Sequence, residues 1–397
     1  MKKRLLFYDI LAQIEHKNAI VVTGMRQVGK TTLLKQLYME IGHEKKRLWF
    51  DFDNPLDMKV FEEIDYRNIY ARLQQMAGAT KDEKIYVFID ELQNFPETTK
   101  IIKYLLDHYG VKFLVTGSSN FYLKNLFPES LSGRKFLYDL PPLNFKEYLY
   151  FHDKISLEQA QEKNISKILL EQNIFTVKRF EPDYEAYLQY GGFPEVVVTE
   201  GQETKQMILK NIFKSFFEKD LKIISDHQDI RELRDLLLLL VPRVGSAMEV
   251  SKLASELGVD RPKIYSYLEF LQGVFMIRLL PKFSHSIDRA VAGGKKVYFS
   301  DNGLLNIIGK VNDAQLLENA VVNQLAIYGE LNFYNKRNTA EIDIILNKEM
   351  AFEIKSSGID SDKTKLERLS ADLKINKNFV ISKKFIDKSG FVSPVIF

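Results

Sequence analysis

Residues 24–31 form a glycine-rich loop that, together with its flanking patterns, most constrains how this chain can fold. They read Gly-Met-Arg-Gln-Val-Gly-Lys-Thr and fit the pattern G-x-x-x-x-G-K-[ST]. Residues 19–23 are apolar and mostly β-branched, which indicates a buried strand, and residues 30–42 have helical spacing. Glycines let the backbone curl so that its N–H groups, with the positive end of the helix, face an anion. The sequence therefore predicts a phosphate-binding loop (the P-loop).

The residues of the P-loop have separate expected roles. Lys30 is expected to reach the β- and γ-phosphates of a nucleotide, and the Thr31 hydroxyl is expected to bind Mg²⁺. Arg26 either touches phosphate or supports the loop. The expected cofactors are thus ATP and Mg²⁺, and the expected nucleotide-binding residues here are Gly24, Arg26, Gln27, Val28, Gly29, Lys30, Thr31 and Thr32. An accidental glycine-rich turn is the alternative interpretation.

Three further apolar stretches, residues 47–53, 84–90 and 111–117, alternate with helical patterns. Near-continuous apolar strands separated by helices indicate a parallel sheet covered on both faces. Residues 1–142 are therefore expected to form an α/β P-loop NTPase domain.

Acidic and polar residues follow two of these strands. Asp90 is expected to hold Mg²⁺ through water, and Glu91 to orient the attacking water, as in a Walker B element. A solvated acidic pair at a strand end is the alternative. After the 111–117 strand, Asn120 either senses the γ-phosphate or only caps the next helix. Arg134 is either an arginine finger, offered to a neighbouring subunit or in cis, or a plain surface arginine.

Composition excludes several other classes of protein. The 397-residue chain has no cysteine, which rules out a disulfide scaffold, thiolate-bound zinc, an iron–sulfur cluster and a cysteine nucleophile. Its net charge is only +3, so contact with nucleic acid requires a local patch. The longest aliphatic run, Leu236–Val241, is far shorter than the roughly 20 residues that cross a bilayer. We expect a cytoplasmic protein with no membrane partner.

The remainder of the chain divides into three expected parts. Residues 143–245 have long amphipathic patterns and predict a helical subdomain. Residues 246–285 read as helix, turn at Gly258, helix and strand, the order of a winged helix-turn-helix. Residues 286–397 predict a small α/β domain.

A hairpin in the last domain gathers acidic residues. With a turn centred on residue 348, Asp343 lies opposite Glu353 and Glu341 opposite Lys355, so all four share one face. Two carboxylates and an ammonium suit a Mg²⁺-dependent phosphodiesterase, in which Asp343 and Glu353 hold the metal and Lys355 steadies the water or the developing charge. A cross-strand salt-bridge cluster is the alternative. Glu318 is either a further acid or a helix-supporting glutamate.

Five segments together resemble a known family. The segments GMRQVGKT, DE (90–91), TGSSN (116–120), LSGR (131–134) and GGFPE (191–195) are similar to those of prokaryotic AAA+-type ATPases with an uncharacterised carboxy-terminal domain. That domain resembles the restriction-endonuclease-like fold, whose D…E-x-K pattern fits Asp343, Glu353 and Lys355, although Ile342 stands where the motif has proline. The resemblance implies an ATPase and a nuclease-like domain, and it leaves the substrate open.

The winged-helix segment leaves DNA contact open. Basic residues around the expected wing outnumber Asp288, and on the second helix Arg261 and Lys263 are balanced by Glu269. In ATPases of the resembled kind such a module also serves as a packing or protein-contact element. The basic residues around the wing are Arg278, Lys282, Arg289, Lys295 and Lys296.

Two functions follow from these residues. The first is an ATP-binding and ATP-hydrolysing molecular switch coupled to a nuclease-like domain that acts on or binds DNA or RNA. The second is a non-hydrolysing ATP-binding regulator whose last domain is a metal-free protein- or DNA-binding module. Glu91 favours the first, because binding alone does not need it. A protein partner and a homo-oligomer remain open.

Overall fold

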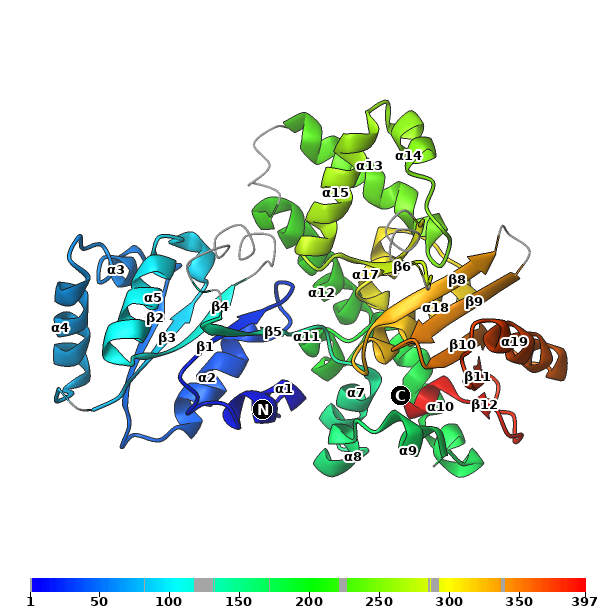
Figure 1. The fold of residues 1–397 in the computed structure, drawn as a ribbon, viewed down its shortest axis with the longest axis horizontal. Coiled ribbons are helices and arrows are strands. Elements are labelled where there is room, and N and C mark those ends of the chain that lie inside the picture. Colours follow the sequence, from blue (N-terminus) through cyan, green and yellow to red (C-terminus); the bar gives the residue numbers. More distant parts are fainter. Residues whose placement is uncertain are drawn as a thin grey trace. The chain divides into compact units, whose positions relative to one another are not determined.

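The computed structural model describes residues 2–81, 83–117, 131, 133–170, 172–220, 227–284, 286, 293–336 and 340–397 (Figure 1). These residues form two compact units, which we describe one at a time. Unit 1 comprises Met1–Pro141 with Gly273–Phe275, and unit 2 comprises Pro142–Gln272 with Met276–Phe397.

Unit 1 is built on a five-stranded sheet in which every pairing is parallel. The strand order is β2-β3-β4-β1-β5, which confirms the expected parallel α/β sheet. The strands are β1 (Ala19–Thr23), β2 (Lys46–Asp51), β3 (Ile85–Asp90), β4 (Lys112–Gly117) and β5 (Lys135–Asp139). The helices are α1 (Leu5–Leu11), α2 (Lys30–Glu40), α3 (Pro55–Met58), α4 (Tyr66–Ala77) and α5 (Thr98–Tyr109).

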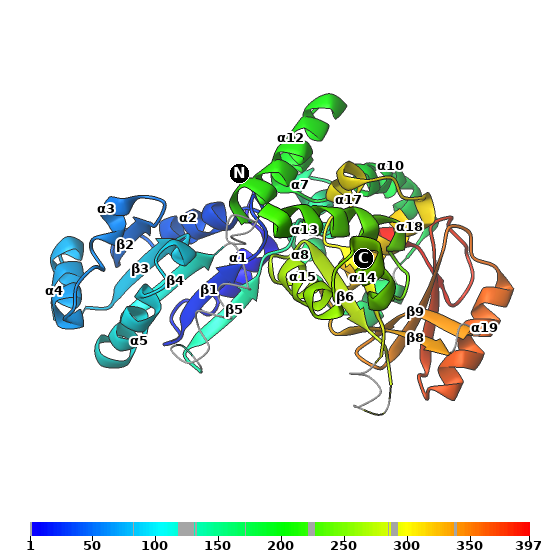
Figure 2. The ribbon, with the colours of Figure 1, turned by 90° about the horizontal axis from the view of Figure 1, so that it is seen from above.

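The burial of each strand explains whether the sequence pattern predicted it. Every residue of β1, β3 and β4 is buried, as expected for central strands between two layers of helices, and Figure 2 shows α2 and α5 on opposite sides of the sheet. The face toward α4 and α5 is apolar and includes Val21, Val87 and Val115. Strand β5 lies at the edge and is only partly buried, so it lacks the apolar run and was not predicted.

Unit 2 begins with a helical region. Its elements, in chain order, are α7 (Phe145–Phe151), α8 (Leu157–Gln161), α9 (Ile165–Leu170), α10 (Ile174–Tyr190), α11 (Pro194–Val198), α12 (Gln202–Ser215), α13 (His227–Leu240), α14 (Val250–Leu257) and α15 (Arg261–Gly273). The chain then forms an antiparallel pair, β6 (Ile277–Pro281) with β7 (Lys295–Phe299). This pair joins residues on both sides of position 285, where the sequence suggested a boundary, and the division of residues 143–397 into three domains stays a prediction.

A second sheet occupies the carboxy-terminal part of unit 2, in the order β12-β11-β10-β9-β8. Strands β8, β9 and β10 pair antiparallel, and β10, β11 and β12 pair parallel. Met350 pairs with Leu346 and Phe352 with Ile344, which confirms a turn centred on residue 348. The elements here are α17 (Asn302–Ile308), α18 (Asp313–Leu325), β8 (Leu331–Lys336), β9 (Ala340–Leu346), β10 (Met350–Lys355), α19 (Asp360–Asp372), β11 (Lys377–Ser382) and β12 (Phe391–Val392).

The GGFPE segment has a structural role inside unit 2. The Asp301 carboxylate accepts hydrogen bonds from the N–H groups of Gly192, at 2.7 Å, and Leu304, at 3.0 Å. A Cβ atom on Gly191 would lie 2.2 Å from this carboxylate, and one on Gly192 would lie 2.0 Å from the Leu143 carbonyl oxygen. The two glycines therefore allow the segment to pack directly against a buried carboxylate.

Candidate functional site

The P-loop connects β1 to α2 at the carboxyl edge of the unit 1 sheet. Gly24 has a φ of +148° and Gly29, which caps α2, has a φ of +96°. A Cβ atom on Gly24 would lie 2.3 Å from the Leu140 carbonyl oxygen, so this position has no room for a side chain. Exposed Gln27 also has a positive φ, of 63°, and Val28 is buried. The conformation of the loop therefore depends on the backbone angles that glycine allows at Gly24 and Gly29.

Lys30 lies inside the loop that precedes it. The residue is 5% exposed, and its Nζ donates to the carbonyl oxygens of Gly24 at 2.9 Å and Met25 at 2.8 Å. Thr31 and Thr32, which follow it, are half-buried, and so is Arg26 earlier in the loop. The ammonium is therefore held at the centre of the loop, where an anion bound by the loop would meet it.

Asp90 and Glu91 lie at the same edge of the sheet. The Thr116 hydroxyl of β4 donates to the Asp90 carboxylate and accepts from the Glu91 N–H at 3.1 Å. Glu91 has a φ of 55°, a conformation uncommon for a residue other than glycine, and its carboxylate accepts from the Gln93 amide. Because only β4 separates β3 from β1, Asp90 lies two strand spacings from the P-loop strand, or about 10 Å.

Arg134 lies at the opposite end of the strands, where the strands of the sheet begin. It directly precedes β5, which runs parallel to β1, so the length of a five-residue strand, about 16 Å, separates it from the P-loop edge. Its Nε donates to the Asp107 carboxylate at 2.6 Å. The geometry therefore does not bring Arg134 to the P-loop of its own chain. Asn120 lies outside the described residues.

Sequence reasoning missed Arg4. Its guanidinium donates to the carbonyl oxygens of Val28 and Pro141, each at 2.8 Å, and the residue is 5% exposed. Arg4 stands in a cluster of basic residues at the amino terminus, and no local pattern separates it from its neighbours. A buried arginine beside a P-loop is visible only once the chain is folded.

Unit 2 brings the predicted hairpin residues together. The Lys355 Nζ donates to Glu353 at 2.7 Å, and Asp343 accepts from the backbone N–H of Ile354 at 2.8 Å. Glu353 is buried. Asp343, Glu353 and Lys355 therefore lie near one another on β9 and β10, whereas Glu341, which was expected opposite Lys355, pairs with Lys296 instead.

A buried lysine from β7 joins these carboxylates. The Nζ of Lys296 lies 2.7 Å from Glu341, 3.5 Å from Glu318 and 3.8 Å from Asp343, and the residue is 2% exposed. The Tyr298 hydroxyl donates to Glu318 at 2.7 Å. We call these seven residues the carboxylate cluster: Lys296, Tyr298, Glu318, Glu341, Asp343, Glu353 and Lys355.

Burial perturbs the acids and bases of the carboxylate cluster. Burial raises the pKa of Glu318 and of Glu353 above the ordinary range, and the charge of Asp343 raises both further. Burial by itself lowers the pKa of Lys296, but the attraction of Glu318, Asp343 and Glu341 outweighs it, so the pKa of Lys296 is raised. The cluster therefore stabilises a charged ammonium and disfavours full ionisation of its acids.

Two lysines that the sequence places on or beside the winged-helix segment are paired with carboxylates. Lys296 points into the carboxylate cluster, and Lys263 of α15 pairs with Asp229 at 2.8 Å and Glu232 at 2.7 Å on α13. Both ammonium groups are paired with carboxylates of the same chain, and contact of the winged-helix segment with DNA stays a prediction. Arg261 is exposed, and Arg289 lies outside the described residues.

Within the part of the chain that the structure describes, no three His, Cys, Asp or Glu side chains are arranged to hold a metal ion. The metal role of Asp343 and Glu353 stays a prediction. Among the same residues, no helix is both long and apolar enough to cross a membrane.

Comparison with known proteins identifies the region that contains the P-loop. Residues 16–149 match the family described as an AAA domain, and residues 181–315 match one described as a domain of unknown function (DUF8612). The first match agrees with the parallel sheet of unit 1, and an AAA domain is what this region is similar to. The second match names no activity.

Relatives align along nearly the whole chain. An uncharacterized protein of Methanocaldococcus jannaschii is 27% identical over 396 residues, which cover 94% of this chain and 84% of the relative. An uncharacterized protein of Haemophilus influenzae is 28% identical over 362 residues, covering 86% and 84%. Among solved structures, the ORC1 protein of Aeropyrum pernix in complex with DNA is 10% identical, covering 76% of this chain and 90% of that one, with a TM-score of 0.31. So low a TM-score says nothing of what this chain binds.

Proposed function

We propose that this chain is an ATP-binding and ATP-hydrolysing switch whose nucleotide site is formed by the P-loop, Asp90 and Glu91. The observation that carries the proposal is the buried Lys30 ammonium at the centre of a loop shaped by Gly24 and Gly29. The match of residues 16–149 to an AAA domain supports it.

The residues present fit a nucleoside triphosphate with Mg²⁺. Helix α2 has 11 residues and begins in the loop, so its first N–H groups and its positive end favour phosphate. The Thr31 hydroxyl and the Asp90 carboxylate are oxygen ligands of the kind that Mg²⁺ prefers. Bound Mg²⁺ would supply positive charge that neutralises the phosphate oxygens.

Lys30 would bind the phosphates, and Glu91 would act in hydrolysis. Lys30 now donates to two loop carbonyls and would donate to phosphate oxygens instead. Glu91, held by Gln93 and by the Thr116 hydroxyl at its own N–H, would orient the attacking water and accept its proton.

Matched variants test this division. We expect Lys30→Ala to abolish tight ATP binding, whereas Lys35→Ala, an exposed lysine of the same helix, should bind as the wild type does. Glu91→Gln should keep binding and lose about 10²–10⁴ in turnover. Nucleotide titration and steady-state hydrolysis measure both effects. Unchanged turnover in Glu91→Gln would remove the role proposed for that carboxylate.

A second candidate function concerns unit 2, where Asp343, Glu353 and Lys355 lie together. Such a set can hold Mg²⁺ and support phosphodiester hydrolysis in DNA or RNA. A nuclease assay with Mg²⁺ or Mn²⁺, with and without ATP, should show cleavage that Asp343→Ala abolishes. Cleavage that persists in Asp343→Ala would come from another source.

One observation favours a metal-free binding module instead. Lys296 already supplies a buried cation to Glu341, Glu318 and Asp343. If the wild type binds neither Mg²⁺ nor Mn²⁺ in unit 2 by calorimetry, we assign this region to binding a protein or nucleic acid. If turnover of ATP is also absent, the chain is a non-hydrolysing regulator.

A further inference from the structure

The amino-terminal segment of unit 1, residues 4–18, runs from the end of the sheet where the strands finish, beside the P-loop, to the end where they begin. We call this segment the strap. At its first end, Arg4 donates to Val28 in the P-loop and to Pro141, the last residue of this part of unit 1 before the chain continues into unit 2. One buried guanidinium therefore holds two backbone carbonyls that are far apart in the sequence.

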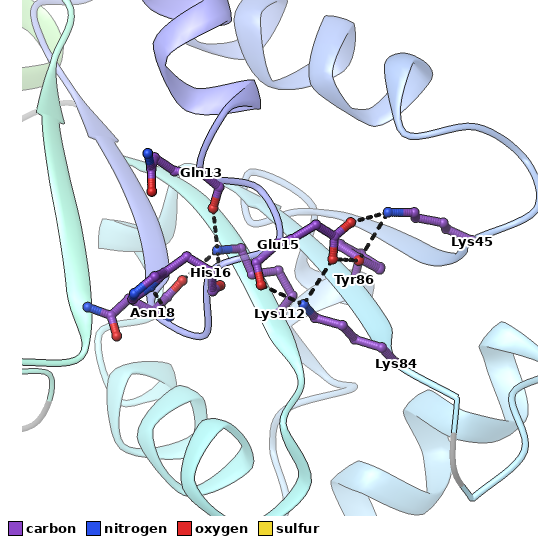
Figure 3. A network of polar contacts seen from close by, with 8 residues as sticks. All are labelled: Gln13, Glu15, His16, Asn18, Lys45, Lys84, Tyr86 and Lys112. Atoms are coloured by element: carbon purple, nitrogen blue, oxygen red, sulfur yellow. Dashed lines mark hydrogen bonds and ion pairs between the residues drawn. The ribbon is translucent and has the colours of Figure 1, made fainter.

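The other end of the strap is held by the buried side chain of Lys112, at the start of β4 (Figure 3). Its Nζ donates to the carbonyl oxygens of Asn18 at 2.6 Å and His16 at 2.7 Å. Burial lowers the pKa of Lys112 to about 8. These carbonyls lie in the segment between α1 and β1. Lys112 therefore holds that segment against the end of the sheet where the strands begin.

Glu15 adds a second attachment at the same end (Figure 3). Its carboxylate accepts from the Tyr86 hydroxyl at 2.7 Å and from Lys84 at 3.3 Å, and it also pairs with Lys45. The hydrogen bonds from Lys45 and Tyr86 lower the pKa of Glu15 to about 2. The far end of the strap is thus attached to residues at the starts of β2, β3 and β4, which restrains the strap relative to the sheet.

At the P-loop end, the loop packs directly against the segment by which the chain leaves the sheet. The Leu140 N–H donates to the Thr23 carbonyl at 2.7 Å, and the Thr23 hydroxyl donates to Asp139 at 2.7 Å. Gly24 approaches the Leu140 carbonyl so closely that a Cβ atom would lie 2.3 Å from it. A change in the backbone of the loop therefore cannot leave residues 139–141 unaffected.

Phosphate binding would change the hydrogen bonds that the loop backbone makes. Lys30 donates to the Gly24 and Met25 carbonyls, and a phosphate that engages Lys30 must compete with them. Val28 belongs to the same loop, and its carbonyl is held by a guanidinium on a restrained strap. Movement of the loop must then alter how Arg4 divides its hydrogen bonds between Val28 and Pro141.

We propose that Arg4 is a positioning residue that couples nucleotide occupancy of the P-loop to the path of the chain at Pro141, where it passes into unit 2. This inference rests on the proposed function, because it requires a nucleotide in the P-loop. It extends that function by naming the link through which the bound nucleotide acts on the remainder of the chain.

Distance measurement between two labels tests the coupling. The chain has no cysteine, so cysteines placed at exposed Gln75 in unit 1 and Glu203 in unit 2 can carry spin labels without background. Pulsed electron resonance then compares the distance distribution without nucleotide, with Mg²⁺ and ADP, and with Mg²⁺ and ATPγS. We expect ATPγS to shift the distribution in the otherwise wild-type chain.

Variants at position 4 separate coupling from binding. Arg4→Met should bind ATPγS within about tenfold of the wild type, equal to about 1.4 kcal/mol, and should lose the shift. Arg4→Lys, whose single ammonium cannot serve both carbonyls in the same way, should lose at least half of it. Lys3→Met, which removes an ion pair with Glu40 and a cation–π contact with Phe7 but no bond to the P-loop or Pro141, should keep the full shift.

The outcomes are distinguishable. Absence of ATPγS binding by the wild type overturns the proposed function itself. Binding without a shift in the wild type, or an unchanged shift in folded Arg4→Met, overturns the coupling while leaving the nucleotide site in place. If circular dichroism shows that Arg4→Met does not fold, Arg4→Lys decides, and an unchanged shift in it overturns the coupling.

Discussion

The P-loop and the carboxylate cluster are both polar sites, but they are made of different parts of the chain. The P-loop is a run of eight consecutive residues, and its shape comes from glycine backbone and the start of a helix. The carboxylate cluster takes side chains from β7, α18, β9 and β10. A site made of contiguous backbone is specified locally, whereas a site made of distant side chains exists only when the sheet and helices have assembled.

The two sites also differ in whether a single chain supplies all of their residues. The carboxylate cluster contains both its acids and its counter-ions in unit 2. The P-loop, by contrast, lies at the other end of the strands from Arg134, which the sequence offers either as a finger or as a surface arginine. If Arg134 is a finger, the P-loop therefore needs a second copy of the chain, whereas the carboxylate cluster does not.

The largest expected effect tests this need. If Arg134 serves the P-loop of a neighbouring chain, ATPase activity per chain should rise with protein concentration, and Arg134→Ala should lose about 10³–10⁵ in turnover while still binding ATP. Hydrolysis measured over a concentration series, with sedimentation of the same samples, checks it. Activity that stays constant in a monomer excludes the finger across a subunit boundary.

The next effect tests whether the carboxylate cluster depends on its internal cation. Lys296→Met leaves Glu318, Glu341 and Asp343 without their shared ammonium, so we expect unfolding free energy to fall by about 3–5 kcal/mol. The exposed neighbour Lys295→Met should change it by less than about 0.5 kcal/mol. Denaturant unfolding measures both. Equal effects of the two substitutions would show that burial of the ammonium has no importance.

A smaller effect tests whether the P-loop requires a residue without a Cβ atom at position 24. Gly24→Ala places a Cβ atom against the Leu140 carbonyl, so we expect a loss of about 1–3 kcal/mol of stability together with loss of ATP binding. Gly78 also has a positive φ, of 57°, but nothing lies near its added Cβ atom. Gly78→Ala should therefore cost only about 1 kcal/mol and keep binding. Retained ATP binding in Gly24→Ala contradicts this account of the loop.

The smallest effect is a pH dependence of stability that comes from the carboxylate cluster. Because the folded-state pKa of Glu318 is raised, its contribution to stability is fully present below its ordinary value of 4.5 and is lost as pH rises toward the raised value. One such proton gives a slope of at most about 1.4 kcal/mol per pH unit. Glu318→Gln should flatten that part of the curve of unfolding free energy against pH. An unchanged slope means that other groups cause it.

Sequence patterns were most informative where the physical signal is local. The buried strands β1, β3 and β4 were predicted because each is an apolar run, and the 350–346 hairpin register was predicted because a two-residue period and a turn position define it. Strand β5 was missed because an edge strand is only partly buried and lacks that run.

The same reasoning could not assign side chains whose partners are far away in the sequence. Lys296 was grouped with the basic residues around the expected wing, because nothing near it in the sequence shows that Glu318 and Glu341 lie beside it. Arg4 stood among other basic residues, and its partners, Val28 and Pro141, are brought to it by the fold.

The sequence by itself determined the strand-to-helix P-loop, the parallel α/β class of its domain and the register of the hairpin that carries Asp343 and Glu353. These features depend on glycine conformation, apolar periodicity and strand register, all of which act over a few residues. Only the tertiary structure decided the edge occupied by Arg134, the burial of Lys296 and the two carbonyls held by Arg4. Those depend on which strands become neighbours, because a buried charge is stable only where the assembled fold supplies its partners.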